Sequence, residues 1–189
     1  MGVCCGSDNN KKIRSRNNPV NKNNKLKKAD TNSSNNLKII DINEKEKILK
    51  RGIIHEIKDL INNLEDNIND YIFGQNKTLL IEACIVCPNC DVIDIIMEKG
   101  ANIDCEEYQT GNTPIFFCAL DLKVDFVEKL LKYHPNISHK NHSQQNIFEF
   151  LKFQLFDQRK SINREMTKIE KEKYEQIENM LKNAIKNQD

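Results

Sequence analysis

The segment Val92-Ile93-Asp94-Ile95-Ile96-Met97 decides the fold, because its apolar pattern returns at a regular interval further along the chain. The spacing i, i+1, i+4, i+5 places the matched residues on one wide helical stripe, as a helix between two neighbours requires. The interval, which we call the repeat period, is about 34 residues and predicts stacked supersecondary units. The matched residues are, in order, Val92, Ile93, Ile96 and Met97, then Phe126, Val127, Leu130 and Leu131.

Local signals around this segment predict a turn followed by two helices in each unit. Gly111 favours a turn, and Thr113-Pro114 places a capping oxygen before a proline at the first helical position. Gly100 follows the second helix, where a residue that accepts positive φ commonly ends it. A shift of 35 relates the first helices, with Thr78, Ala83 and Cys84 matched by Thr113, Cys118 and Ala119.

These motifs resemble those of a known repeat family. Gly111-Asn112-Thr113-Pro114-Ile115-Phe116 resembles the Gly-x-Thr-Pro-Leu-His opening of an ankyrin repeat, and residues 97–104 are similar to its close, Leu-x-x-Gly-Ala-Asp-Val-Asn. The resemblance is good over 74–140 and looser on either side. It implies an all-α ankyrin solenoid of three or four degenerate repeats over 37–158. The family's histidine is replaced by Ile81 and Phe116, so its usual hydrogen bond to threonine is missing.

The flanks of this domain differ from it in composition. Residues 1–36 are rich in Asn, Lys and Ser, with few apolar side chains, which predicts a disordered basic arm. Eight bases and one acid give residues 1–28 a net charge of +7, so the remaining residues carry −6 of the total of +1. A charged helix is expected over 161–187, within a C-terminal segment 159–189. Its thin apolar stripe would cap the last repeat or, alternatively, bind a partner. The stripe residues are Ile162, Met166, Ile169, Ile177, Met180, Leu181 and Ala184.

The N-terminus Met1-Gly2-Val3-Cys4-Cys5-Gly6-Ser7 carries signals for lipid attachment. Loss of Met1 exposes Gly2 for myristoylation, although Gly6 replaces the Ser or Thr of the usual pattern. Palmitoylation of Cys4 and Cys5 would turn weak single-chain binding into durable anchoring. We therefore expect a peripheral protein at the cytosolic face of the plasma membrane or an internal membrane. Four bases would add attraction to an acidic leaflet: Lys11, Lys12, Arg14 and Arg16.

The remaining sequence favours a binding protein over an enzyme. It contains no glycine-rich phosphate loop, nucleophile elbow or paired acid motif, so we expect no catalytic residues and no cofactor. The basic arm lacks interleaved aromatic residues, so we expect no nucleic-acid partner. No apolar run approaches the roughly 18 residues of a membrane-spanning helix.

Two groups of residues raise metal binding as an alternative. The first is a set of thiols whose spacing resembles zinc or iron–sulfur ligands, although Cys84 also fits a small core position of the repeat. The second is a group of histidines in one loop region, which more simply decorate the loops between repeats. We predict no metal site in either group. The residues concerned are Cys84, Cys87, Cys90 and Cys105, and His134, His139 and His142.

The family resemblance implies a protein-binding surface on the projecting turns and inner helices. By position the turns are 73–77, 107–112 and 140–145. The expected function is a membrane-tethered scaffold or adaptor for an unidentified protein partner. The alternative is a regulatory subunit that inhibits an enzyme through the same surface. The candidate contact residues are Tyr108, Gln109, Asn112, Asp121 and His142.

Overall fold

The structure is a computed structural model that describes residues 41–64, 67–70, 72–74, 76–161 and 164–187. These residues belong to one unit, Leu37–Asp189. The fold class is all-α, as predicted: the described residues contain no strand, only an isolated bridge between Phe73 and Lys77. Among these residues, no helix has both the length and the apolar character needed to cross a bilayer.

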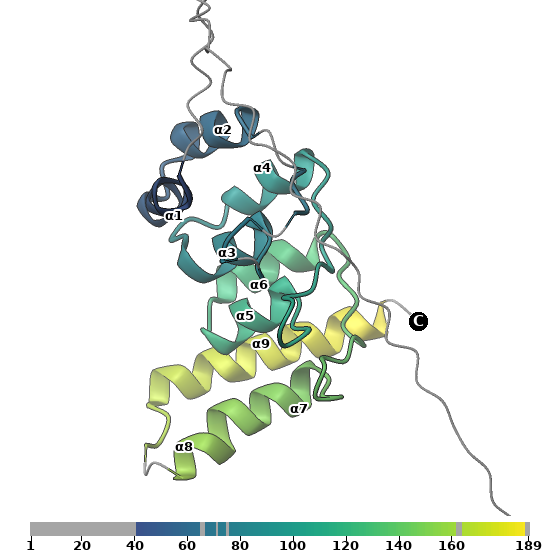
Figure 1. The fold of residues 1–189 in the computed structure, drawn as a ribbon. Coiled ribbons are helices and arrows are strands. Elements are labelled where there is room, and N and C mark those ends of the chain that lie inside the picture. The colour runs from purple at the N-terminus through teal and green to yellow at the C-terminus, as the bar shows by residue number, and fades with distance from the viewer. Residues whose placement is uncertain (1–40, 65–66, 71, 75, 162–163, 188–189) are drawn as a thin grey trace, which may run out of the picture. The chain divides into compact units, whose positions relative to one another are not determined.

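The helices form two sets that pack side by side in chain order (Figure 1). In the first set, called the inner helices, each of α1, α3, α5 and α7 contacts the next. In the second set, called the outer helices, α2, α4, α6 and α9 do the same. The inner helices are α1 (Ile42–Arg51), α3 (Leu79–Val86), α5 (Pro114–Leu120) and α7 (Ile147–Lys152), and the outer helices are α2 (Ile54–Asn62), α4 (Val92–Glu98), α6 (Val124–Leu131) and α9 (Lys168–Lys186).

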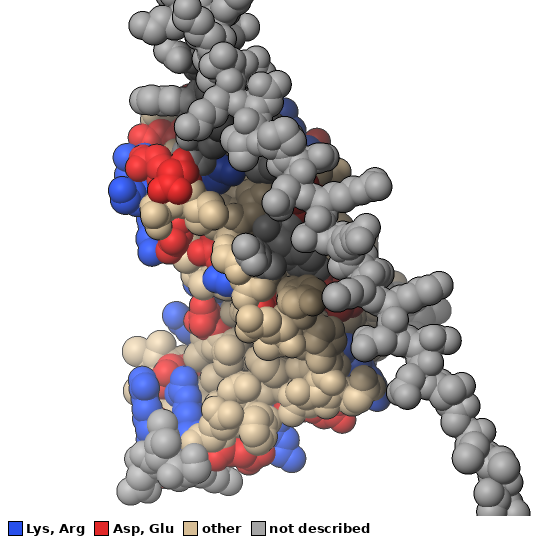
Figure 2. Space-filling model, viewed as in Figure 1, with Lys and Arg blue, Asp and Glu red and all other residues tan. Residues whose placement is uncertain are grey.

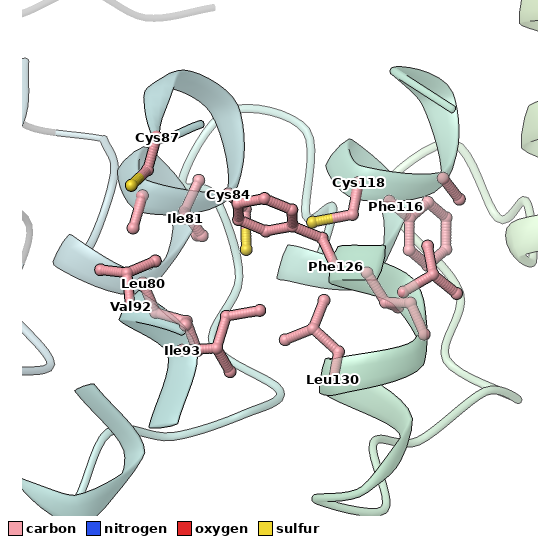
Figure 3. Close-up of a cluster of buried hydrophobic side chains, with 14 of the residues drawn as sticks. Leu80, Ile81, Cys84, Cys87, Val92, Ile93, Phe116, Cys118, Phe126 and Leu130 are labelled. Atoms are coloured by element: carbon pink, nitrogen blue, oxygen red, sulfur yellow. The ribbon is translucent and has the colours of Figure 1, made fainter. Parts of the chain in front are cut away.

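The core lies between consecutive helix pairs, where the repeating stripe was predicted. Six of the eight stripe residues are buried, and only Met97 and Leu131 of that stripe stay partly exposed. Figure 3 shows side chains from α3 and α4, and from α5 and α6, pointing into the space between the two pairs. Apolar burial of this kind contributes about 1.5–3 kcal/mol for each large side chain. The buried stripe residues are Val92, Ile93, Ile96, Phe126, Val127 and Leu130.

A ladder of hydrogen bonds joins the turns that precede each new unit. In each turn an asparagine side chain accepts the amide two residues further on, a local arrangement favoured by Asn. Successive turns are then linked. The amide of Asn102 donates to Asn69 Oδ1 at 2.7 Å, and the amide of Asn136 donates to Asp104 Oδ1 at 2.9 Å. These bonds fix the register between neighbouring units.

The C-terminal helix begins later than predicted. Residues 164–167 are not helical, and α9 starts at Lys168 because Thr167 and Glu170 form a capping box. Ile169, which was assigned to the apolar stripe, is 65% exposed. Ile177 and Leu181 are buried instead, where α9 packs against α6. The predicted stripe is therefore correct only in the second half of the helix.

The last inner helix is longer than the others. α7 continues through a π-helical turn, η1 (Phe153–Asp157), into α8 (Gln158–Ser161). The helical run thus covers residues 147–161, whereas α3 and α5 have eight and seven residues. In Figure 1 this run and α9 lie next to each other at the end of the helix stack. Figure 2 shows blue and red side chains at the edges of this end of the stack, around a front face that is largely tan.

Candidate protein-binding surface

Three loops precede α3, α5 and α7, and we call them the loop ridge: the described residues of 73–77, then 107–112 and 141–145. The same backbone hydrogen bond joins each loop to the next. The amide of Tyr108 donates to Asn76 O at 3.0 Å, and the amide of His142 donates to Thr110 O at 2.9 Å. The two donors are one repeat period apart, and so are the two acceptors. The period seen in the helices therefore extends to the loops.

Glu107 holds the middle loop together. Its side chain is buried, and Oε2 accepts from the amide and hydroxyl of Thr110 at 2.7 and 2.6 Å, while Oε1 accepts from Asn76 Nδ2 at 2.9 Å. Burial alone would raise the pKa of Glu107, but these hydrogen bonds and one from the amide of Gln109 outweigh it and lower the pKa. The ionised carboxylate is thus a structural part of the loop.

In the third loop, Asn141 forms hydrogen bonds both within its own loop and to the preceding loop, as Glu107 does in the middle loop. Its buried Oδ1 accepts from the amides of Ser143 and Gln145 at 3.0 Å each, and its Nδ2 donates to Asn112 Oδ1 at 3.0 Å. Neither Glu107 nor Asn141 was singled out from the sequence. Their separation by one repeat period was the available signal.

Two histidines connect the middle and third loops at Gly111. His139 Nε2 donates to Gly111 O at 2.8 Å, and His142 Nδ1 donates to Gln109 O at 3.1 Å. Gly111 has φ +68°, and a Cβ there would lie 2.5 Å from His142 Cδ2. Glycine is therefore required both for the backbone angle and for the close approach of the ring.

The candidate contact residues divide into three groups. Tyr108 is 68% exposed, and Gln109 and His142 are also exposed on the loop ridge. Asn112 lies beneath this surface, because it is only 5% exposed and is bonded to Asn141. Asp121 is exposed but follows the last residue of α5, about 10 Å from the ridge at 1.5 Å per residue.

The inner helices also expose some apolar side chains. One position, seven residues after the N-cap of each helix, stays partly exposed in three successive inner helical runs. The residues are Ile85, Leu120 and Phe153, the last of which is 43% exposed in η1. At 1.5 Å per residue this row lies about 10 Å from the loop ridge, towards the other end of the inner helices, near Asp121.

Three of the four cysteines considered as metal ligands have separate contacts, and Cys87 Sγ donates to Asn89 O at 3.4 Å. Cys84 is fully buried against Cys118 of the next inner helix, and burial raises its pKa well above the usual value. Cys105 Sγ lies 3.1 Å from Thr78 Oγ1, and burial raises the pKa of Cys105 to about 11. Within the described ranges, no three His, Cys, Asp or Glu side chains gather closely enough to hold a metal ion.

The predicted lipid-attachment and membrane-electrostatic residues lie outside the described part of the chain. They are Gly2, Cys4, Cys5, Lys11, Lys12, Arg14 and Arg16. The chain matches no family model, and no curated protein matches its sequence.

Proposed function

We propose that this protein is a membrane-tethered ankyrin-repeat adaptor that holds a partner protein at the cytosolic face of a membrane. The repeated bond between successive loops carries the proposal, because it builds one continuous ridge from three separate segments. A ridge with exposed Tyr108, Gln109 and His142 offers an aromatic and two hydrogen-bonding side chains to a partner. Aromatic residues are enriched where interfaces carry most of their binding energy.

The assignment to ankyrin repeats rests on three features taken together. Helix pairs recur at the repeat period, the turns before each new unit are linked by side-chain hydrogen bonds, and the loops project before each inner helix. The motif at Gly111-Asn112-Thr113-Pro114 lies at the start of α5, where the family has its opening motif. Repeat solenoids of this kind bind partners through the extended surface formed by successive units.

The membrane tether rests on the sequence of the N-terminus. A myristoyl chain alone binds a bilayer with K on the order of 10⁴ M⁻¹, so stable anchoring takes a second signal. Cys4 and Cys5 provide a site for that signal, and the basic residues that follow provide a third contribution near an acidic leaflet. The tether would place the binding surface at a membrane, whichever partner it binds.

Membrane fractionation tests the tether. The Gly2→Ala protein should move from the membrane fraction to the cytosol, because myristoylation requires an N-terminal glycine and palmitoylation needs the membrane residence that the myristoyl chain gives. The Cys4→Ala/Cys5→Ala protein should remain weakly and reversibly bound through one acyl chain. Lys58→Ala, on exposed α2, serves as the control and should fractionate like the wild type. Persistence of the Gly2→Ala protein on membranes would contradict the tether.

Proximity labelling of the full chain in its native cell tests the binding surface. Tyr108→Ala should remove the proteins that depend on the loop ridge, while Lys58→Ala should retain them. The bond from Tyr108 to the preceding loop is made by its backbone amide, which the Tyr108→Ala protein keeps. An identical set of labelled proteins for both variants would contradict the surface. A single stoichiometric enzyme among the lost proteins would favour the inhibitory-subunit alternative over a scaffold.

A further inference from the structure

A cleft of about 290 Å³ lies between the helical run η1–α8 and the segment that leads into α9. The π-helical turn η1 supplies Leu155 and Phe156 to its floor, and Met166, just before α9, completes it. Leu155 and Met166 are buried, and the Phe156 ring packs edge-on against Tyr174 of α9 at 5.1 Å between centroids. π-Helical turns often occur at functional sites, because they displace side chains from regular α-helical positions.

The rim of this cleft is basic. Arg159, Arg164 and Lys171 line it, together with one acid, Glu165, and with Glu170, the ion-pair partner of Arg159, these five residues carry a net charge of +1. Arg159 is held in place by an ion pair of 3.1 Å with Glu170. The amide of Thr167 and then the Arg159 guanidinium lower the pKa of Glu170 to about 2, so this pair stays charged at neutral pH.

The other two rim cations are available to a ligand. Neither Arg164 nor Lys171 forms an ion pair with any residue that the structure describes, and both side chains are exposed. A binding site for a small molecule commonly combines an apolar surface with a few convergent polar groups. Here the apolar floor and the basic rim lie within one cleft.

We propose that this cleft binds an acidic amphiphile: one carboxylate or phosphate group on a linear apolar chain. The headgroup would lie between Arg164 and Lys171, and the chain would cover Leu155, Phe156 and Met166. The volume corresponds to about ten water-sized groups at roughly 30 Å³ each, which limits the enclosed part of the chain to medium length. Inorganic phosphate would leave the floor uncovered, and a neutral hydrocarbon would leave the two cations without a counter-charge. This site is separate from the loop ridge and needs no lipid anchor.

Methionine-methyl NMR of the full, non-acylated chain can test the site. The sequence has four methionines, of which Met97 and Met180 lie away from the cleft and serve as internal references. Sodium decanoate and decyl phosphate should each shift the Met166 methyl signal in a saturable manner and leave Met97 and Met180 unchanged. Decanol, which has the same chain without the charge, should bind at least tenfold more weakly.

Charge variants separate the proposal from simple partition of a hydrocarbon chain. Arg164→Glu/Lys171→Glu should weaken decanoate binding at least tenfold, and Arg164→Gln/Lys171→Gln should weaken it by a smaller factor. Lys152→Glu makes the same charge change per residue at an exposed position of α7 and should leave the affinity for decanoate unchanged. Unaltered Met97 and Met180 signals in each unliganded variant establish that the fold is retained.

The source of the amphiphile can be resolved by adding vesicles. Phosphatidylserine vesicles that shift the Met166 signal while phosphatidylcholine vesicles do not would assign the headgroup to a bilayer lipid. A response to the single-chain amphiphiles but to neither kind of vesicle would assign the headgroup to a free single-chain acid. Either result supports the site. Equal shifts with decanol and decanoate, or equal affinity in the wild type and the charge-reversed variant, would overturn it.

Discussion

The first helices of two consecutive units, α3 and α5, both follow a threonine N-cap, but the two threonine hydroxyls have different surroundings. Thr78 Oγ1 accepts from the amide of Ile81 at 3.4 Å and lies 3.1 Å from Cys105 Sγ. Thr113 Oγ1 is buried without a hydrogen-bond partner among the described residues. Yet Thr113 lies in Gly111-Asn112-Thr113-Pro114, which resembles the opening motif of an ankyrin repeat more closely than the segment around Thr78 does. The comparison teaches that a well-matched motif can lack the interaction that the motif usually provides.

The partner of Thr78 explains the difference. Cys105 corresponds, one repeat period later, to His139, which donates its Nε2 proton to Gly111 O rather than to Thr113. Phe116, three residues after Thr113, packs its ring against Phe150 at 5.3 Å and edge-on to His139 at 6.0 Å. In the second unit His139 therefore contacts an aromatic ring and a backbone carbonyl, and Thr113 Oγ1 has no hydrogen-bond partner among the described residues.

The largest effect is expected from Gly111→Ala, compared with Gly74→Ala in the preceding loop. Both glycines have positive φ, which costs a non-glycine residue about 1–2 kcal/mol. At Gly111 the new Cβ would also collide with the His142 ring, whereas at Gly74 it meets only Asn76 Oδ1 at 3.2 Å. We expect Gly111→Ala to lower the free energy of unfolding by about 3 kcal/mol and Gly74→Ala by about 1. Urea unfolding measures both, and equal losses would contradict the contact.

The next effect concerns the ends of the same two helices. Lys123 Nζ donates to Cys84 O and Ile85 O at 2.7 and 2.6 Å, and so binds two carbonyls at the C-terminus of α3. The corresponding residue one repeat period later, Asp157, has no proton to donate to α5 when ionised. Lys123→Met should therefore reduce the free energy of unfolding by about 2 kcal/mol, as expected for hydrogen bonds to a charged group. Lys58→Met is the exposed control, and a similar loss there would argue against capping.

Substitution of the two threonines by valine should change stability in opposite directions. Thr78→Val removes an N-cap and should destabilise the protein by about 1 kcal/mol. Thr113→Val removes a buried hydroxyl without a partner among the described residues and should stabilise the protein by about 1 kcal/mol. Valine keeps the shape of threonine, so packing changes little. Thermal melting of both variants measures the sign, and destabilisation by Thr113→Val would show that its hydroxyl has a partner in solution.

The smallest effect concerns the loops before these helices. Glu107 corresponds to Phe73 one repeat period earlier, so of these two loops only the middle one carries a carboxylate at this position, and that carboxylate also accepts from Asn76 of the first loop. Its lowered pKa stabilises the fold fully above the unfolded-state value of about 4.3, and this contribution is lost as the pH falls through the lower folded-state pKa. Below pH 4 the protection of the Thr110 amide, measured relative to its intrinsic exchange rate, should fall, while the protection of the Phe73 amide should not. The Glu107→Gln variant should lose this pH dependence, and protection at Thr110 that stays constant with pH would contradict it.

Much of the fold follows from local pattern. The stripe Val92–Met97 and its copy predicted α4 and α6, and Thr113-Pro114 predicted the start of α5, because caps and helical spacing act over a few residues. The start of α9 also had a local signal, the capping box of Thr167 and Glu170, although the helix was predicted to begin at residue 161. Tyr108, Gln109 and His142 are exposed in the loops where they were proposed as contact residues, and their role in binding stays a prediction.

Other features depend on contacts between distant residues, which spacing alone does not give. Cys105 as the partner of Thr78 requires the turn of one unit to meet the helix start of another. The burial of Asn112 depends on Asn141, a residue of the following loop. The cleft near Met166 depends on how η1 and α9 meet, because no single segment contains both its floor and its rim.

The position of α9 has a consequence for how the array could lengthen by duplication. In the preceding units an inner helix and its outer helix are close in sequence, so a segment one repeat period long can be copied as a complete unit. The last pair is different, because the extended run 147–161 separates α7 from α9. A copied segment inserted after residue 161 would displace α9 from α6. Tandem duplication of a repeat-length segment is therefore compatible with the segments before Asn146. The last pair, the run 147–161 and α9, cannot be copied as one such segment.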